Sequence, residues 1–214
     1  MKIVIFDMDG TLIDTKKDIT ISINYVRKEH YDLPPLTEQF IVDAINMPVR
    51  NLPDLFYNTS VYQEKDRDLF EEHYFQQCIK SPYLYEGIAD TLEQLKSLHV
   101  SLNVATNAPT LFAKRMLRHL NVSDMFDTII GADEAGASKP DPKMLEMILA
   151  NYGYGYMPHK AWMVGDNSKD IEAAKNISIG SIFATWGFSS EGYADYVVSH
   201  PLNIVDIVKC QKLF

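Results

Sequence analysis

The stretch KIVIFDMDGT, residues 2–11, joins a short apolar run to two aspartates, Asp7 and Asp9, and a glycine, Gly10. The run is near-continuous rather than alternating, which is typical of a strand buried on both faces of a parallel sheet. Open parallel sheets bind their ligands at the carboxyl ends of the strands. Asp7 and Asp9 leave the strand at that end, so we expect them at a ligand site.

Four further apolar runs have the same character, and segments with helical spacing separate them. The runs are SLNVAT (101–106), DTIIGA (127–132), AWMVGD (161–166) and SIFAT (181–185). Apolar residues recur with helical spacing within 88–98, 111–120 and 144–149, as in helices with one buried face. This alternation predicts an α/β fold with a doubly wound, Rossmann-like parallel sheet and right-handed crossovers.

Residues 15–82 interrupt the alternation directly after the first strand. They contain three helix-like stretches, around 19–26, 40–45 and 69–79, and no convincing buried strand. We therefore predict a small all-helical cap domain at 15–82, inserted into an α/β core formed by 1–14 and 83–214. Such an insert would overhang the strand ends and close over a ligand there.

The composition indicates a globular protein with an acidic balance. The chain has 214 residues, with 20 Lys and Arg against 29 Asp and Glu, a formal net charge of -9. This charge disfavours non-specific binding to nucleic acid or to an anionic membrane. Cys78 and Cys210 show no spacing typical of a zinc site or a disulfide framework. No signal peptide or membrane-spanning run is evident, and we expect a soluble, cytoplasmic protein.

Polar residues gather at the predicted strand ends. Thr106 and Asn107 follow the second run, Asp166 and Asp170 follow the fourth, and Lys139 lies in the loop GASKPDP (136–142). Carboxylates suit Mg²⁺, which usually binds a few of them together with water and a substrate phosphate. A carboxylate can also attack phosphorus while a lysine and a hydroxyl neutralise the phosphoryl oxygens. The pattern therefore favours phosphoryl transfer assisted by Mg²⁺.

Each of these residues has a structural alternative when taken alone. Asp7 or Asp9 could cap a turn, and Asp166 followed by Asn167 has the composition of a helix N-cap. Lys139 by itself would be a solvated surface lysine. Because all of them converge on one sheet edge, the functional interpretation is favoured.

Four segments resemble, in order and spacing, the motifs of the haloacid dehalogenase-like phosphohydrolase superfamily: DMDGT (7–11), ATN (105–107), SKPDP (138–142) and GDNSKD (165–170). The resemblance covers most of the chain outside 15–82. It implies a phosphoric monoester hydrolase that uses Mg²⁺ and acts on a small phosphorylated metabolite.

The resemblance implies roles for the acids and the lysine. Asp7 would be the nucleophile and a metal ligand. Asp9 would be the general acid and base and would bind the metal through its backbone carbonyl. Lys139 would steady the nucleophile and the phosphate charge. Asp166 would bind the metal, and Asp170 would ligate it or orient its waters.

Substrate contacts are expected from a second set of residues. By the same resemblance, Thr106 would hydrogen-bond the phosphoryl oxygens, assisted by Asn107 and by the backbone around Gly10. In the insert, Arg50 could bind a substrate carboxylate, with an ordinary surface arginine as the alternative. Trp186 follows the fifth run and could line the pocket or simply pack.

Asp9 and the helical insert narrow the range of reactions that the resemblance implies. In the superfamily an acid at position 9 argues for hydrolysis or a mutase-type transfer, and a helical cap here looks like that of phosphoglycolate phosphatase and beta-phosphoglucomutase. Mutases more often have valine where Thr11 stands, and 86–109 and 163–188 look most like phosphoglycolate phosphatases. We expect a phosphatase that forms a phospho-Asp7 intermediate, with phosphoglycolate as the first candidate substrate.

Several alternatives stay open. Sugar phosphates, nucleotides and pyrophosphate are other candidate substrates, and a phosphosugar mutase is an alternative enzyme. A non-catalytic binding protein of the same fold is the alternative from another class. We expect a monomer or a homodimer without nucleic-acid or membrane partners.

Overall fold

The computed structural model describes residues 1–47, 51–155, 160–189 and 191–210. The chain divides into two compact units, one formed by Met1–Ile13 with Leu84–Phe214 and the other by Asp14–Tyr83. The chain passes between them at two short strands, β2 (Ile13–Asp14) and β3 (Tyr83–Leu84), which pair with each other.

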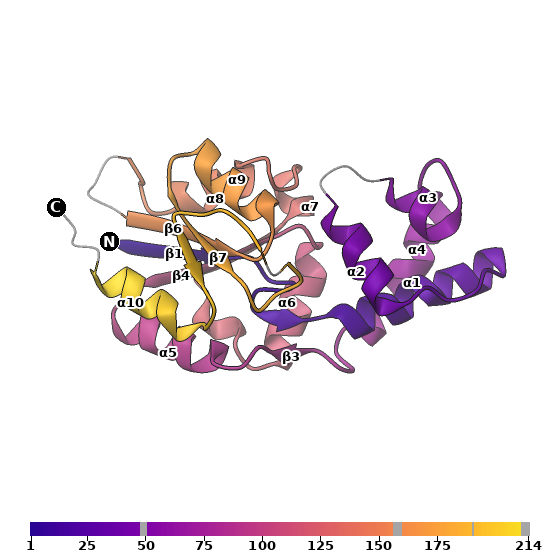
Figure 1. The fold of residues 1–214 in the computed structure, drawn as a ribbon, viewed down its shortest axis with the longest axis horizontal. Helices are drawn as coiled ribbons and strands as arrows, with labels where there is room; N and C mark the ends of the chain where they lie inside the picture. The colour runs from indigo at the N-terminus through magenta and orange to yellow at the C-terminus, as the bar shows by residue number, and fades with distance from the viewer. Residues whose placement is uncertain (48–50, 156–159, 190, 211–214) are drawn as a thin grey trace. The chain divides into compact units, whose positions relative to one another are not determined.

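The first unit contains a six-stranded parallel sheet in the order β5-β4-β1-β6-β7-β8 (Figure 1). The chain runs from β1 outward through β4 and β5 on one side, then returns to build β6, β7 and β8 on the other. The direction therefore reverses at β1, and ligands of such sheets bind where this reversal occurs. The strands are β1 (Lys2–Phe6), β4 (Ser101–Thr106), β5 (Thr128–Gly131), β6 (Lys160–Gly165), β7 (Gly180–Ala184) and β8 (Tyr196–Val198).

Helices cover both faces of this sheet, with α8 (Lys143–Ala150) and α9 (Ser168–Asn176) on one face and α5 (Ile88–Ser97) and α10 (Leu202–Cys210) on the other (Figure 1). Buried side chains of α8 and α9 pack in one cluster with Ile3 and Ile5 of β1. The remaining helices of the unit are α6 (Thr110–His119), α7 (Ala132–Ala135) and the 3₁₀ turn η1 (Ser123–Met125). The predicted doubly wound α/β fold is confirmed.

The five predicted strands are all present in this sheet, and the described residues add a sixth strand to it, β8. β8 was missed because its apolar run, YVV, is only three residues long, which is too short to predict a strand; Val197 in it is 56% exposed. Leu111, which the spacing placed on the buried face of a helix, is 59% exposed. The face that α6 buries instead includes Phe112, Met116 and Leu117.

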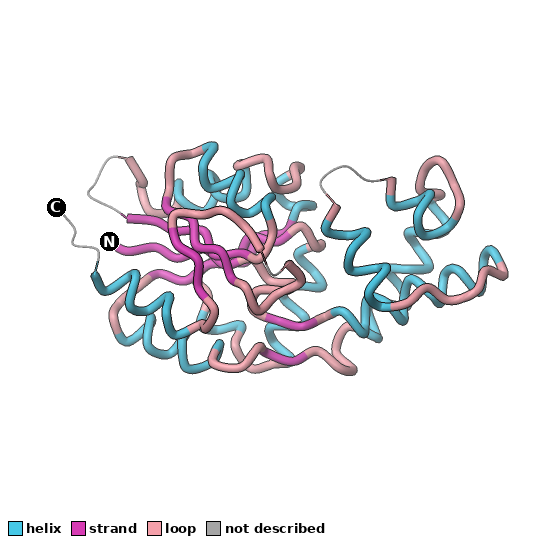
Figure 2. Tube along the Cα trace, viewed as in Figure 1, coloured by secondary structure: helices cyan, strands magenta, loops and turns pink. Residues whose placement is uncertain are grey.

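The second unit is helical, as Figure 2 shows. It contains α1 (Lys16–Tyr31), α2 (Glu38–Asn46), α3 (Leu52–Tyr57) and α4 (Glu64–Gln77), one helix more than the three predicted. α1 packs against the other three helices, and Ile23, Val26 and Ile41 form part of its apolar core. No helix in the described part of the chain is long and apolar enough to cross a membrane.

Candidate active site

Asp7 is buried at the end of β1, where the chain turns away from the sheet. Its N–H donates to the carbonyl of Val164 in β6 at 2.8 Å, which continues the strand pairing by one residue. The turn that follows passes through Gly10, whose φ is +87°. A Cβ there would lie 2.4 Å from Oδ2 of Asp166, so both the backbone conformation and the close approach require glycine.

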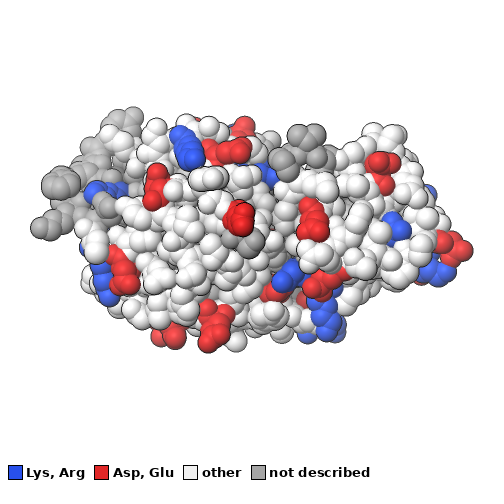
Figure 3. Space-filling view, in the orientation of Figure 1, with Lys and Arg blue, Asp and Glu red and all other residues white. Residues whose placement is uncertain are grey.

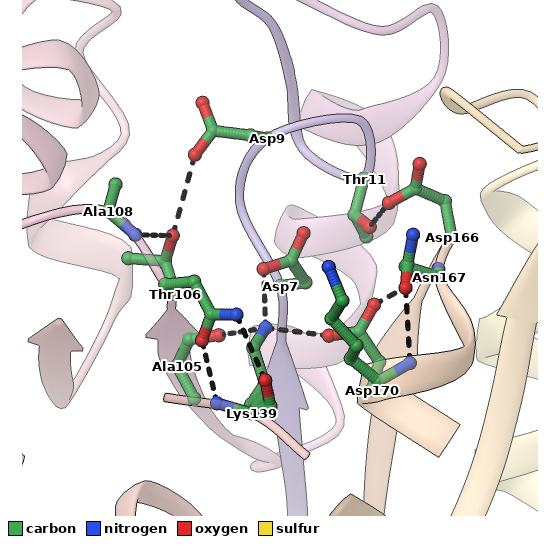
Figure 4. Close-up of polar contacts among 12 residues, drawn as sticks. Asp7, Asp9, Thr11, Ala105, Thr106, Ala108, Lys139, Asp166, Asn167 and Asp170 are labelled. Atoms are coloured by element: carbon green, nitrogen blue, oxygen red, sulfur yellow. Dashed lines mark hydrogen bonds and ion pairs between the residues drawn. The ribbon is translucent and has the colours of Figure 1, made fainter. Parts of the chain in front are cut away.

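Lys139 is 3% exposed and joins three parts of the site (Figure 4). Its Nζ lies 2.5 Å from Oδ1 of Asp7, 2.6 Å from Oδ1 of Asp170 and 2.6 Å from the carbonyl of Ala105. These three acceptors match the three N–H donors of an ammonium group. Burial alone would lower the pKa of Lys139, but the charges of Asp170 and Asp7 outweigh it and raise the pKa above its usual value. The lysine therefore stays charged.

Asp166 follows β6 and receives a hydrogen bond on each carboxylate oxygen. The Thr11 hydroxyl donates to Oδ1 at 3.0 Å, and the N–H of Phe188 donates to Oδ2 at 2.7 Å. Gly187, the residue before Phe188, packs closely against Gly10: a Cβ on Gly187 would lie 2.3 Å from the carbonyl oxygen of Gly10. The turn after β7 thus supports both Asp166 and the turn after β1.

Asp170 serves the helix and the site at once. It lies in the first turn of α9, where Asn167 is the N-cap and the two side chains form a capping box. Oδ2 of Asp170 accepts from the N–H of Asn167 at 3.1 Å, while Oδ1 faces Lys139. The N-cap interpretation of this segment and the functional one are therefore compatible.

Asp7, Asp166 and Asp170 form a buried acidic cluster, in which one carboxylate oxygen from each lies within 4.8 Å of the others. Burial raises the pKa of Asp7 well above its usual value; Lys139 opposes the rise, and the neighbouring acids add to it. Burial and the charge of Asp170 raise the pKa of Asp166 to about 7. Three buried carboxylates against one ammonium leave an excess of negative charge, and this hard-oxygen donor set fits Mg²⁺.

Asp9 is half-buried and points away from the acidic cluster toward β4 (Figure 4). The Thr106 hydroxyl lies 3.4 Å from Oδ2 of Asp9 and accepts from the N–H of Ala108 at 3.1 Å. The side chains of Asp7 and Asp9 therefore have separate surroundings, one among the other acids and Lys139, the other beside Thr106.

Asn107 uses both polar atoms of its side chain on one residue. Its Oδ1 accepts from the N–H of Lys139 at 2.8 Å, and its Nδ2 donates to the carbonyl of Lys139 at 3.2 Å. The expected contacts of Asn107, Thr106 and the Gly10 backbone with substrate stay predictions.

Sequence reasoning missed the contributions of the turn after β7. For Trp186 we expected either a place in the pocket lining or simple packing. In the structure its Nε1 donates a hydrogen bond to the carbonyl of Thr11 at 3.0 Å. A glycine in a strand-end turn was the available signal for Gly187.

Arg50 lies outside the described residues, so its expected role stays a prediction. On the face shown in Figure 3, acidic and basic side chains are interspersed.

The fold and the site together define a class of protein. Its members are α/β proteins with a doubly wound parallel sheet, and a group of acidic residues with a lysine lies at the carboxyl ends of the strands. Comparison with known proteins gives the family. The sequence profile of the haloacid dehalogenase-like hydrolases matches residues 4–184, and the chain belongs to this family.

The relatives include phosphatases of two kinds. The chain is similar to phosphoglycolate phosphatase of Aquifex aeolicus, with 33% identity over 97% of each chain. It is also similar to N-acetylmuramic acid 6-phosphate phosphatase of Pseudomonas aeruginosa, with 28% identity over 97% of this chain and 95% of the relative. The crystal structure of a predicted phosphoglycolate phosphatase from Haemophilus somnus has the same fold, with a TM-score of 0.83, 24% identity and 97% of each chain covered. The expected enzyme class, a phosphatase of this family, is confirmed.

Proposed function

We propose that the protein is a Mg²⁺-dependent phosphatase that hydrolyses a small phosphorylated metabolite through a phospho-Asp7 intermediate. The observation that carries the proposal is the buried Asp7 carboxylate, held on one oxygen by Lys139 and flanked by Asp166 and Asp170. Because Oδ1 faces the lysine, Oδ2 is the atom that we assign to the attack on phosphorus.

The reaction would proceed in two displacements. In the first, Oδ2 of Asp7 bonds to phosphorus, the ester P–O bond breaks, and Asp9 gives its proton to the leaving oxygen. In the second, Asp9 takes a proton from water as the water oxygen bonds to phosphorus; the acyl-phosphate bond breaks, restoring Asp7 and releasing phosphate. Thr106 and Lys139 would neutralise the phosphoryl oxygens.

Asp7 and Asp166 would hold Mg²⁺, with the backbone carbonyl of Asp9. When bound, the ion would offset the charge of the acidic cluster and of the transferring phosphoryl group. Asp170 would ligate the ion or orient its waters.

Phosphoglycolate is the first candidate substrate. The name of the Aquifex aeolicus relative supports this candidate. The name of the Pseudomonas aeruginosa relative supports a sugar phosphate as the alternative substrate. Both named compounds carry a carboxylate as well as a phosphate, which supports a carboxylate-binding role for Arg50. We expect the enzyme to work in the cytoplasm as a monomer or a homodimer.

The test is phosphate release from phosphoglycolate, sugar phosphates, nucleotides and pyrophosphate, with Mg²⁺ or with EDTA, beside the Asp7→Asn variant. We expect release that needs Mg²⁺ and disappears in the variant, while circular dichroism shows an unchanged fold. If Asp7→Asn hydrolyses as fast as wild type, Asp7 is not the nucleophile. Isomerised sugar phosphate without phosphate release would identify a mutase instead.

A further inference from the structure

The side chain of Asn107 connects two loops through hydrogen bonds, and each loop carries one residue of the site, Thr106 or Lys139. Asn107 directly follows Thr106 at the end of β4, and Lys139 lies 32 residues further on. The two hydrogen bonds between them, at 2.8 and 3.2 Å, engage the N–H and the carbonyl of the same residue. The amide thus pairs with the Lys139 backbone much as a neighbouring strand would.

This tie matters because the Lys139 ammonium sits at the end of a flexible four-carbon stem. Its three contacts, with Asp7, Asp170 and the Ala105 carbonyl, all require that the lysine backbone be held at the correct distance. Pro140, the next residue, has no N–H with which to fix the loop. A shift of about 1 Å in a positioned group can slow a reaction by ~10²-fold.

We propose that Asn107 is a positioning residue, which fixes the Lys139 backbone so that its ammonium stays on Asp7, and that it is not primarily a substrate ligand. The inference rests on the proposed function and goes beyond it, because it assigns to Asn107 an action through another residue. A direct ligand of the phosphate would chiefly affect substrate binding, whereas a support for Lys139 chiefly affects the transfer step.

The chain offers a matched control in Asn176, at the end of α9. Its Nδ2 donates to the carbonyl of Pro140 at 3.2 Å, so it also tethers this loop, but at Pro140 and not at the Lys139 backbone groups that Asn107 holds. Asn107→Ala should lower kcat by roughly 10–100-fold while KM and the inhibition constant of inorganic phosphate change by less than about 3-fold. Asn176→Ala should leave kcat within about 2-fold of wild type.

A second measurement needs no turnover. Acetic anhydride labelling in EDTA, read by mass spectrometry, compares the buried Lys139 with the exposed Lys143 of the same region. We expect Asn107→Ala, but not Asn176→Ala, to increase labelling of Lys139 several-fold relative to Lys143. This result would hold even if the wild-type protein released no phosphate from any substrate, a failure that would touch the proposed function alone.

Two results would overturn the inference. Unchanged Lys139 labelling in Asn107→Ala would show that the tie does not hold the lysine. A higher KM or phosphate inhibition constant with unchanged kcat would make Asn107 a substrate ligand. If the alanine variant does not fold, Asn107→Asp replaces it, because aspartate keeps the acceptor for the Lys139 N–H but cannot donate to the Lys139 carbonyl; the same outcomes apply.

Discussion

The N–H of Phe188 donates a 2.7 Å hydrogen bond to Oδ2 of Asp166, although the two residues leave different strands of the sheet. Gly187 makes this contact possible, because its backbone packs directly against Asp166 and Gly10. The turn after β7 is therefore part of the support of the acidic cluster.

Gly187→Ala should destabilise the fold and weaken Mg²⁺ binding. The new Cβ would lie 2.3 Å from the Gly10 carbonyl and 2.4 Å from Cβ of Asp166, and the first of these is a backbone atom that cannot rotate away. We expect a loss of about 1–3 kcal/mol in the free energy of unfolding and a lower Mg²⁺ affinity by isothermal titration calorimetry. Gly153→Ala is the control for Mg²⁺ binding: its φ of +62° makes alanine strained there, so it should also lose stability, but its Cβ would meet no described atom within 4 Å, and unchanged Mg²⁺ affinity is expected. Equal affinity in both variants would contradict the prediction.

Asp9→Ala should slow turnover by ~10²–10⁴-fold, the usual cost of losing a general acid or base. Mg²⁺ affinity should change little, because the Asp9 side chain lies beside Thr106 and outside the cluster of Asp7, Asp166 and Asp170. Steady-state kinetics and calorimetry on the same preparation check both statements. A wild-type rate in this variant would remove the acid–base role.

Lys139→Arg should fail to preserve activity even though it preserves the charge. The lysine is 3% exposed and its compact ammonium meets three acceptors, a geometry that a larger planar guanidinium does not match. We expect at least ~1 kcal/mol of destabilisation from overpacking, with a large fall in kcat. Lys143→Arg, on an exposed residue nearby, should be neutral in chemical denaturation and in kinetics. Full activity in Lys139→Arg would mean that charge alone suffices.

The metal-free protein should become more stable as the pH falls from 8 to 6.5. The folded-state pKa of Asp166 is raised to about 7, and that of Asp7 is raised as well. Above those values the folded state bears the cost of burying ionised carboxylates, together with their mutual repulsion, and proton uptake by the folded state relieves both. Calorimetric Tm values in EDTA should therefore rise on acidification. Saturating Mg²⁺ should abolish or reverse the trend, because the ion competes with protons; a Tm that falls in EDTA would contradict the prediction.

The interior of the core unit was predictable because its strands are buried on both faces. Four consecutive residues of β1 are fully buried: Ile3, Val4, Ile5 and Phe6. Each of these positions therefore requires an apolar residue, and the sequence shows a continuous apolar run. β8 lies at the sheet edge and has only three residues, which are too few to establish such a pattern. The short helix α3 was missed for a similar reason, because six residues are too few to establish a period.

The site was predictable wherever its chemistry depends on particular side chains. Asp7, Asp166, Asp170 and Lys139 are brought together as their motifs implied. The contacts made by backbone groups could not be foreseen, since the Ala105 carbonyl and the Phe188 N–H are available in any sequence. Only the geometry of the strand ends determines which of these groups face the site.

The central position of β1 also has a consequence for synthesis on the ribosome. β1 is complete at Phe6, yet its two neighbours in the sheet are β4 and β6, and β6 ends only at Gly165. At ~5–20 residues per second, the nascent chain would wait roughly 8–30 s between making this apolar segment and making its second partner. During that interval at least one side of β1 lacks its partner strand, as at an aggregation-prone sheet edge. We therefore expect the first strand made to be among those that most need shielding by a chaperone before the sheet can close around it.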